Sequence, residues 1–261
     1  MTADVNHGPP TDKVMTVVEH LSELRLRIFI SLVAVAAGAV VGYYFTPDVI
    51  TVLSAPVGET LFTLTVGGAL FIRLKLALMI GLALASPVVL YQLWAFVSPG
   101  LTAHERRVAR PWIPLALVFL VLGVGVAYVT LPFTVAFLLS FQITGVIEPL
   151  ITAESYFGFV TTMFLAFGVV MEFPIVLVLL SKVGIVNVER LRRGRRYVFV
   201  GIFIIAVVVT PGGDPISPII MATVMYPLYE LTIWLVARSD RGKESLRLET
   251  PTRRARNDRR T

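Results

Sequence analysis

The chain has 261 residues, of which 56% are apolar and only 15% are charged, whereas soluble globular chains average about 45–50% and 25%. A soluble domain of this composition lacks the polar side chains to cover its core, so the composition indicates a membrane protein. The 23 Lys and Arg residues lie in blocks between long apolar runs, which excludes a nucleic-acid-binding surface. Because Cys is absent, thiol catalysis, disulfides and Cys-ligated metals are also excluded.

Four apolar runs are long enough to cross a bilayer, which needs about 20 residues in a helix. In chain order they are 28–45, 76–97, 111–133 and 157–181. The fourth run contains one charged residue, Glu172.

Two shorter apolar runs follow. Residues 197–209 make only 13 apolar positions, or roughly 20 Å of helix, which is less than the hydrocarbon thickness. A Gly- and Pro-rich turn then leads into 217–237, which Pro227 and Glu230 interrupt. We interpret both as short spans; a re-entrant hairpin is the alternative. The sequence thus predicts an all-α membrane protein with six transmembrane helices, the last two short.

The positive charges predict the orientation. Of the 23 Lys and Arg residues, 21 lie in the segments 1–27, 98–110, 182–196 and 237–261. The segments on the opposite side, 46–72, 134–157 and 211–216, contain none. The positive-inside rule therefore predicts that both termini are cytoplasmic.

The predicted domain organisation is simple. Residues 1–237 form a single six-helix membrane domain, with an interfacial N-terminal helix at about 14–27. Residues 238–261 form a charged, Arg-rich cytoplasmic tail that we expect to be disordered.

Motifs for catalysis and nucleotide binding are missing from the chain. It contains no G-x-S-x-G, H-E-x-x-H, Walker A or G-x-G-x-x-G. Its three histidines, His7, His20 and His104, all lie outside the predicted spans. We therefore expect no enzymatic activity, no metal and no cofactor, which leaves a transporter or channel, or a receptor or scaffold.

Polar residues in the N-terminal segment form the first candidate site. Glu19, Glu23 and Arg27 recur at intervals of four, on a different helix face from the apolar positions of 14–28. Such a helix would lie in the membrane interface and lead into the first span. Alternatively, Glu23 only pairs with Arg27, for a few tenths of a kcal/mol.

The second candidate site lies after the second span. Tyr91, Trp94 and Phe96 suit the aromatic belt of a membrane interface. Glu105 is the only acid in a loop that also contains three arginines. The alternative is that this loop is a positively charged anchor in which Glu105 is incidental.

Three further acids stand out. Glu172 lies at membrane depth, where a charge costs about 2.5–3.5 kcal/mol, so a functional role is favoured over an acid kept neutral by burial. Pro174 is expected to kink the helix beside it. For Asp214, in the Gly/Pro turn, and Glu230, near the inner end of the last span, we expect structural roles.

Several segments of the chain, taken in order, resemble the TatC family, the signal-peptide receptor component of the bacterial twin-arginine protein translocase. They are HLSELRLR at 20–27, LSAP at 53–56, LYQLWAF at 90–96 with ERR at 105–107, FGVVME at 167–172, and TP at 210–211 with YE at 229–230. One segment departs from the family pattern: the turn reads Thr-Pro-Gly-Gly-Asp, where the family often has Thr-Pro-Pro-Asp, which leaves the role of Asp214 open.

The resemblance implies a cytoplasmic site for the two consecutive arginines of a signal peptide. It assigns Glu23 and Glu105 to hold the arginines, with Phe96 and Arg25 beside them. The chemistry is suitable, because carboxylates bind guanidinium through charge-assisted, often bidentate hydrogen bonds.

The resemblance also implies partners and a location. Glu172 would face a concave pocket for small single-span Tat subunits of the TatA/TatB type, and Pro56 would shape the outer cap. The protein would be a receptor in the bacterial cytoplasmic membrane, homo-oligomeric within its complex, for proton-motive-force-driven export of folded proteins. The alternative is a small proton- or ion-coupled secondary transporter that uses Glu172.

Overall fold

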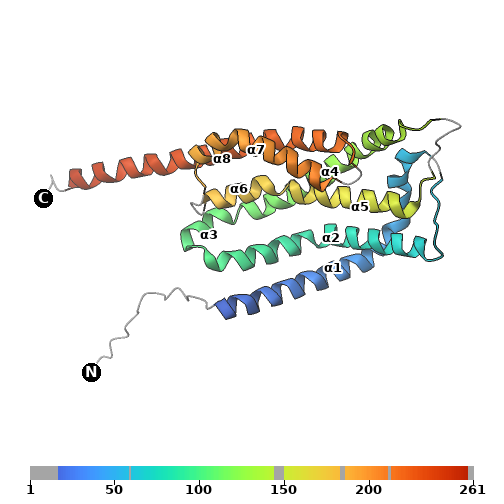
Figure 1. Ribbon diagram of the computed structural model, residues 1–261. Helices are drawn as coiled ribbons and strands as arrows, with labels where there is room; N and C mark the ends of the chain where they lie inside the picture. Colours follow the sequence, from blue (N-terminus) through green and yellow to red (C-terminus); the bar gives the residue numbers. More distant parts are fainter. Residues whose placement is uncertain (1–16, 59, 144–149, 183–185, 211–212, 258–261) are drawn as a thin grey trace, which may run out of the picture.

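A computed structural model describes residues 17–58, 60–143, 150–182, 186–210 and 213–257. The long helices are α1 (Val17–Ser54), α2 (Gly68–Val97), α4 (Trp112–Leu139), α5 (Ala153–Val170), α6 (Phe173–Lys182), α7 (Val188–Val209) and α8 (Ile216–Asn257); short helical segments are η1 (Ala55–Val57), η2 (Ser98–Gly100) and α3 (Ala103–Ala109). The long helices form an elongated bundle (Figure 1). The start of α1 and the far end of α8 lie at the same end of the bundle as α3.

Six helical spans make up the bundle, as predicted. Five stretches are long and apolar enough to cross a membrane: Val17–Val57, Gly68–Gly100, Trp112–Leu139, Ala153–Ser181 and Ile216–Arg238. The sixth is α7, whose first half contains the arginines and whose second half is apolar. It packs along α8, and the Tyr229 hydroxyl of α8 donates to the Leu191 carbonyl of α7 (2.7 Å). With 22 residues, α7 is about 33 Å long, enough to cross a bilayer, which favours two spans over a re-entrant hairpin.

The core of the bundle lies around α5. Half of the most apolar window of Ala153–Ser181 is buried (50%), against 6% for the window in α1. Phe157 and Phe167 of α5 are fully buried and share one apolar cluster with Leu131 of α4 and Tyr229 of α8. The first helix is thus peripheral and packs mainly against α2.

Glycines allow α1 and α2 to approach closely. A Cβ atom added to Gly81 of α2 would lie 2.4 Å from the backbone nitrogen of Ala39, and one added to Gly38 of α1 would lie 2.7 Å from the Gly81 carbonyl oxygen. Small residues at a helix crossing permit such backbone contact in membranes. The position of α1 therefore depends on the glycines at the crossing, which have no side chain to keep the two backbones apart.

The fourth span is broken in the middle, between α5 and α6. Pro174 has no N–H to donate to the carbonyl of Val170, and its ring crowds the preceding turn. The Glu172 N–H instead bonds to the carbonyl of Val169, three residues back (3.1 Å). The predicted kink beside Glu172 is confirmed.

Backbone pairing closes the opposite end of the bundle. Pro56 lies in η1, directly after α1. Phe62, in the following loop, donates to the carbonyl of Ile151 (3.2 Å) and accepts from the N–H of Ala153 (2.8 Å). This links the loop after α1 to the start of α5, while the cap role of Pro56 stays a prediction.

Two segments differ from the expectations. From Val17 onward, the predicted interfacial helix at 14–27 is the beginning of α1, because no Gly or Pro interrupts it before the span; residues 14–16 lie outside the described chain. The tail, which was expected to be disordered from residue 238, is helical up to Asn257 as a continuation of α8 (Figure 1). Arg, Lys, Glu, Leu and Ala, which have high helix propensity, make up 11 of the 19 residues 239–257, and this composition favours the continuation.

Candidate functional site

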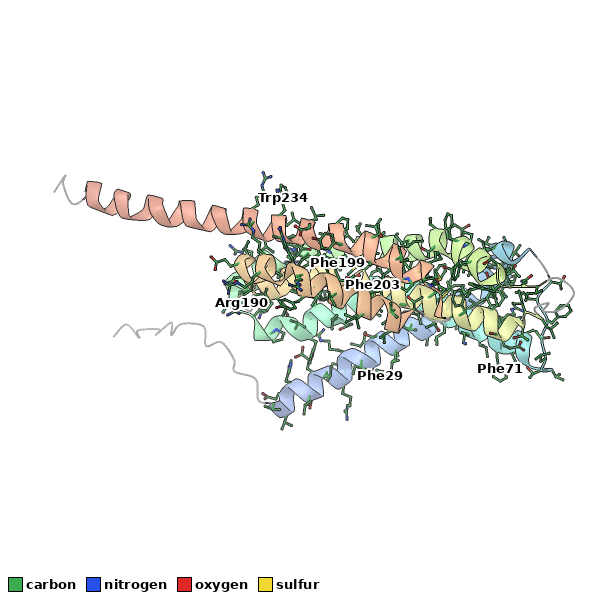
Figure 2. The ribbon with its side chains drawn as sticks, turned by 45° about the horizontal axis from the view of Figure 1, so that its top comes forward. Phe29, Phe71, Arg190, Phe199, Phe203 and Trp234 are labelled. Carbon is green, nitrogen blue, oxygen red and sulfur yellow. The ribbon has the colours of Figure 1, made fainter. Side chains whose placement is uncertain are left out.

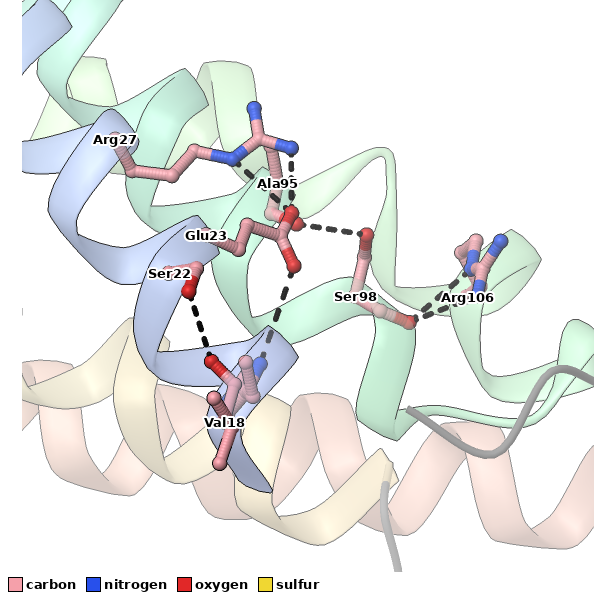
Figure 3. A network of polar contacts seen from close by, with 8 residues as sticks. Val18, Ser22, Glu23, Arg27, Ala95, Ser98 and Arg106 are labelled. Carbon is pink, nitrogen blue, oxygen red and sulfur yellow. Dashed lines mark hydrogen bonds and ion pairs between the residues drawn. The ribbon is translucent and has the colours of Figure 1, made fainter. Parts of the chain in front are cut away.

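A charged pair at the beginning of α1 is anchored to the end of α2. Arg27 donates from Nε (3.2 Å) and Nη2 (2.8 Å) to Oε1 of Glu23. Its third nitrogen, Nη1, donates to Oε1 of Gln92 on α2 (2.9 Å). Figure 3 shows Glu23 and Arg27 beside the segment of α2 that contains Ala95. Arg27 therefore holds the carboxylate in a defined place and joins two helices.

The second carboxylate oxygen of Glu23 is still available. Oε2 is buried and accepts no hydrogen bond from any described residue. The Nδ1 atom of His20 lies 3.9 Å from it. The His20 ring stacks on Phe96 of α2, with centroids 4.2 Å apart and planes at 9°. The structure thus brings together Glu23 and Phe96, two of the predicted site residues, with His20 between them.

Arg25 is not part of this cluster. It is exposed, and residues two apart on a helix do not face each other, so its side chain leaves α1 on a different side from Glu23.

Glu105 has a structural role as well as its charge. Its Oε2 accepts the backbone N–H of Thr102 (2.8 Å), and its own N–H bonds to the Thr102 hydroxyl (3.4 Å), which forms a capping box at the start of α3. The next residue, Arg106, donates from Nε (3.2 Å) and Nη2 (3.0 Å) to the Ser98 carbonyl (Figure 3). Both carboxylates lie at the same end of the bundle, Glu23 on α1 and Glu105 on α3 (Figure 1).

Three contributors to this end of the bundle were not predicted from the sequence. The capping box could have been found, because Thr102 stands three residues before Glu105. His20 and Gln92 could not be assigned in this way: each contacts its partner across two helices, and no local spacing indicates such a contact.

Glu172 lies in an apolar groove of about 650 Å³. Residues of α1, α2, α4 and α5 line it, among them Val52, Met79, Leu82, Leu120, Val124 and Phe164. The Oε1 atom of Glu172 is buried and has no hydrogen-bond partner among the described residues. A carboxyl group in such surroundings is expensive unless a polar partner satisfies it.

Asp214 and Glu230 connect helices. The Oδ1 atom of Asp214 accepts the backbone N–H of Ser217 (2.7 Å), at the start of α8, and lies 3.5 Å from the Thr134 hydroxyl of α4. The Thr134 and Ser217 hydroxyls are 2.8 Å apart. Glu230 of α8 pairs with Arg195 of α7 (2.8 Å). Each acid thus contacts a neighbouring helix.

The fold and these sites define a multi-pass α-helical membrane protein with a carboxylate cluster at one end and an apolar groove along its side. A family model described as Sec-independent protein translocase protein (TatC) matches residues 19–223. The chain therefore belongs to the TatC family.

Relatives and solved structures agree with this assignment. A Sec-independent protein translocase protein TatC from Carboxydothermus hydrogenoformans is 36% identical over 86% of this chain and 93% of its own length. A chloroplastic relative from Arabidopsis thaliana is 37% identical over 89% of this chain and 69% of its own. A crystal structure of the twin arginine translocase receptor TatC in DDM superimposes with a TM-score of 0.71, at 36% identity, over 84% of this chain and 99% of that one.

Family membership decides between the two classes of function that the sequence left open. The chain is a protein-transport component of the Tat system, and the small-transporter alternative is not supported. Members of this family are described as translocase proteins, and that description names no chemical reaction.

Proposed function

We propose that the chain is the receptor subunit of its translocase, and that it binds the twin-arginine signal peptides of folded proteins through Glu23 and Glu105. The observation that carries this proposal is the Glu23 carboxylate. One of its oxygens is held by Arg27, and the other is buried without a hydrogen bond from any described residue. An incoming guanidinium supplies the missing donor, and charge-assisted bonds of this kind contribute about 1.5–3 kcal/mol.

The neighbouring side chains suit an arginine better than a lysine. Phe96 and His20 form a stacked aromatic pair next to Glu23, and a planar guanidinium can lie against an aromatic face while it bonds in two places. A lysine ammonium is a compact charge without this planar fork. The proposed site therefore discriminates through geometry as well as charge.

Two substitutions of Glu105 can separate the contribution of its charge from that of helix capping. In Glu105→Gln the side chain still suits the capping box but loses its charge, whereas Glu105→Ala loses both. We expect Glu105→Gln to weaken twin-arginine peptide binding about tenfold without lowering the melting temperature. Peptide titration and thermal unfolding measure the two effects. If Glu105→Gln binds normally and only Glu105→Ala is impaired, Glu105 acts through capping alone.

For the groove, we propose that it receives small single-span Tat subunits of the TatA/TatB type. An apolar helix with one polar side chain at the depth of Glu172 would fill the groove and satisfy Oε1 at the same time. Several copies of this chain would assemble with these subunits, and the proton-motive force would drive export.

The proposed location is the bacterial cytoplasmic membrane with both termini in the cytoplasm, which the distribution of Lys and Arg supports. Single cysteines can be placed in this Cys-free chain at Ser54, Ser155 and Ser239. An impermeant thiol reagent outside the cell should label the first two positions and not the third. Labelling at Ser239 in sealed cells would reverse the orientation.

A further inference from the structure

A second cavity lies away from both proposed sites, between the arginine-rich end of α7 and the neighbouring part of α8. Its volume is about 430 Å³, within the range of small-molecule sites. The residues that line it are Arg192, Arg195, Glu230, Ile233, Trp234, Ala237 and Arg238.

The cavity carries excess positive charge. Arg195 pairs with Glu230 (2.8 Å), so these two charges compensate each other. Arg192 and Arg238 have no acidic partner among the ion pairs of the described residues. The Arg238 guanidinium lies 5.3 Å from the centre of the Trp234 ring, which orients it beside the cavity. Two guanidinium groups are thus left to bind an anion.

An apolar surface begins next to these charges. Arg238 is the last residue of the span Ile216–Arg238, and the adjacent Trp234 is 54% exposed. Phe199 and Phe203 of α7 are also exposed, and Figure 2 places both farther along the bundle than Trp234. Tryptophan at the end of a span is typical of the membrane–water interface. A ligand here meets positive charge at one side and hydrocarbon-facing side chains at the other.

We propose that this cavity binds the headgroup of an anionic phospholipid. Arg192 and Arg238 would bond the phosphate, and the acyl chains would follow the surface of Trp234 and Phe199. Basic pockets between helices at a membrane interface bind anionic headgroups in this way, and guanidinium matches phosphate geometry. The inference is independent of signal-peptide binding.

Native mass spectrometry of the full chain in detergent, with phosphatidylglycerol or phosphatidylcholine added, tests the proposal. The pocket variant is Arg192→Gln with Arg238→Gln. The control variant is Arg193→Gln with Arg196→Gln, which removes the same charge from exposed positions of α7 outside the cavity. We expect the pocket variant to lose about tenfold in affinity for phosphatidylglycerol relative to the control. Both variants must elute as single species with an unchanged melting temperature.

A competition experiment distinguishes a site for a lipid headgroup from a site for a soluble phosphate compound. Glycerol phosphate, which has the charge but no acyl chains, should not displace phosphatidylglycerol at equal concentration. Displacement would show a site for soluble anions. Equal losses in the two variants would show diffuse surface charge, and equal binding of both lipids by the unaltered protein would show that no anionic site exists. Each of these results would overturn the proposal.

Discussion

Glu23 and Glu172 are both partly buried carboxylates, but their surroundings differ completely. Glu23 is held by two hydrogen bonds from Arg27 and lies among His20, Phe96 and Gln92 at the end of the bundle. Glu172 lies in an apolar groove at a helix break, with Oε1 unbonded within the described chain.

The surroundings of each acid indicate how it can recognise a partner. At Glu23, Arg27 already holds Oε1, which shows that the site accepts a guanidinium, and a ligand arginine would supply the donor that Oε2 lacks. At Glu172 no described residue bonds Oε1, so a partner would complete an unsatisfied group and need only bring one polar atom. The site at Glu23 can select its ligand strongly by shape and charge. The groove at Glu172 can accept any helix that places a polar atom at the depth of the carboxyl group.

The largest effect is expected for Gly81→Ala, because this substitution would disturb the surroundings of both Glu23 and Glu172. α1 supplies Glu23 and part of the wall of the groove, and Gly81 sets its distance from α2. In Gly81→Ala the new Cβ would lie 2.4 Å from the Ala39 nitrogen, and overpacking of this kind costs about 1–3 kcal/mol or more. Thermal unfolding in detergent should show a clear drop in the melting temperature.

Gly201 of α7 provides the control, because a Cβ there would meet nothing within 4 Å. Gly201→Ala should leave stability unchanged or raise it by about 0.5–1 kcal/mol, since Gly is less favourable than Ala within a helix. Equal destabilisation by the two substitutions would contradict the account of close packing between α1 and α2.

The next largest effect is expected for a substitution that alters the site at Glu23 and leaves the groove at Glu172 intact. Glu23→Gln removes the charge that an arginine would bind, and its amide oxygen can still accept the hydrogen bonds from Arg27. We expect twin-arginine peptide affinity to fall about ten- to a hundredfold, while co-purification of the small subunits persists. Glu189→Gln, which removes the same charge from an exposed position in the first turn of α7, is the matched control and should bind normally. A similar loss in both variants would indicate general electrostatic attraction.

The smallest effect is expected for substitutions that alter only the groove at Glu172. Glu172→Leu removes the unsatisfied carboxyl group and should lower co-purification of single-span subunits several-fold, since a hydrogen bond between helices in a membrane contributes about 0.6–2 kcal/mol. Glu172→Gln keeps a hydrogen-bonding group and should retain most of it. Peptide binding should be unchanged in both. If Glu172→Leu recruits subunits and exports substrate normally, Glu172 is only a tolerated buried acid.

Much of the fold could be predicted because bilayer thickness constrains it. The spans follow from run length, and the break after α5 follows from Pro174. The close approach of α1 to α2 could not be predicted, because it depends on Gly38 meeting Gly81 across two helices. The same applies to the site: Glu23 and Arg27 are one turn apart and visible as a pair, whereas Gln92 lies 65 residues from Arg27. Local patterns do not indicate which helices become neighbours.

The central claim is that Glu23 and Glu105 distinguish consecutive arginines from other positive charge. The most direct measurement is crosslinking of the purified protein to a twin-arginine peptide and to a twin-lysine control, with a photoreactive group next to the pair. We expect selective crosslinks near Glu23 and Glu105 for the twin-arginine peptide, and loss of this selectivity in the Glu23→Gln, Glu105→Gln double variant. Selectivity that survives in the double variant would contradict the account and place the reader elsewhere in the protein.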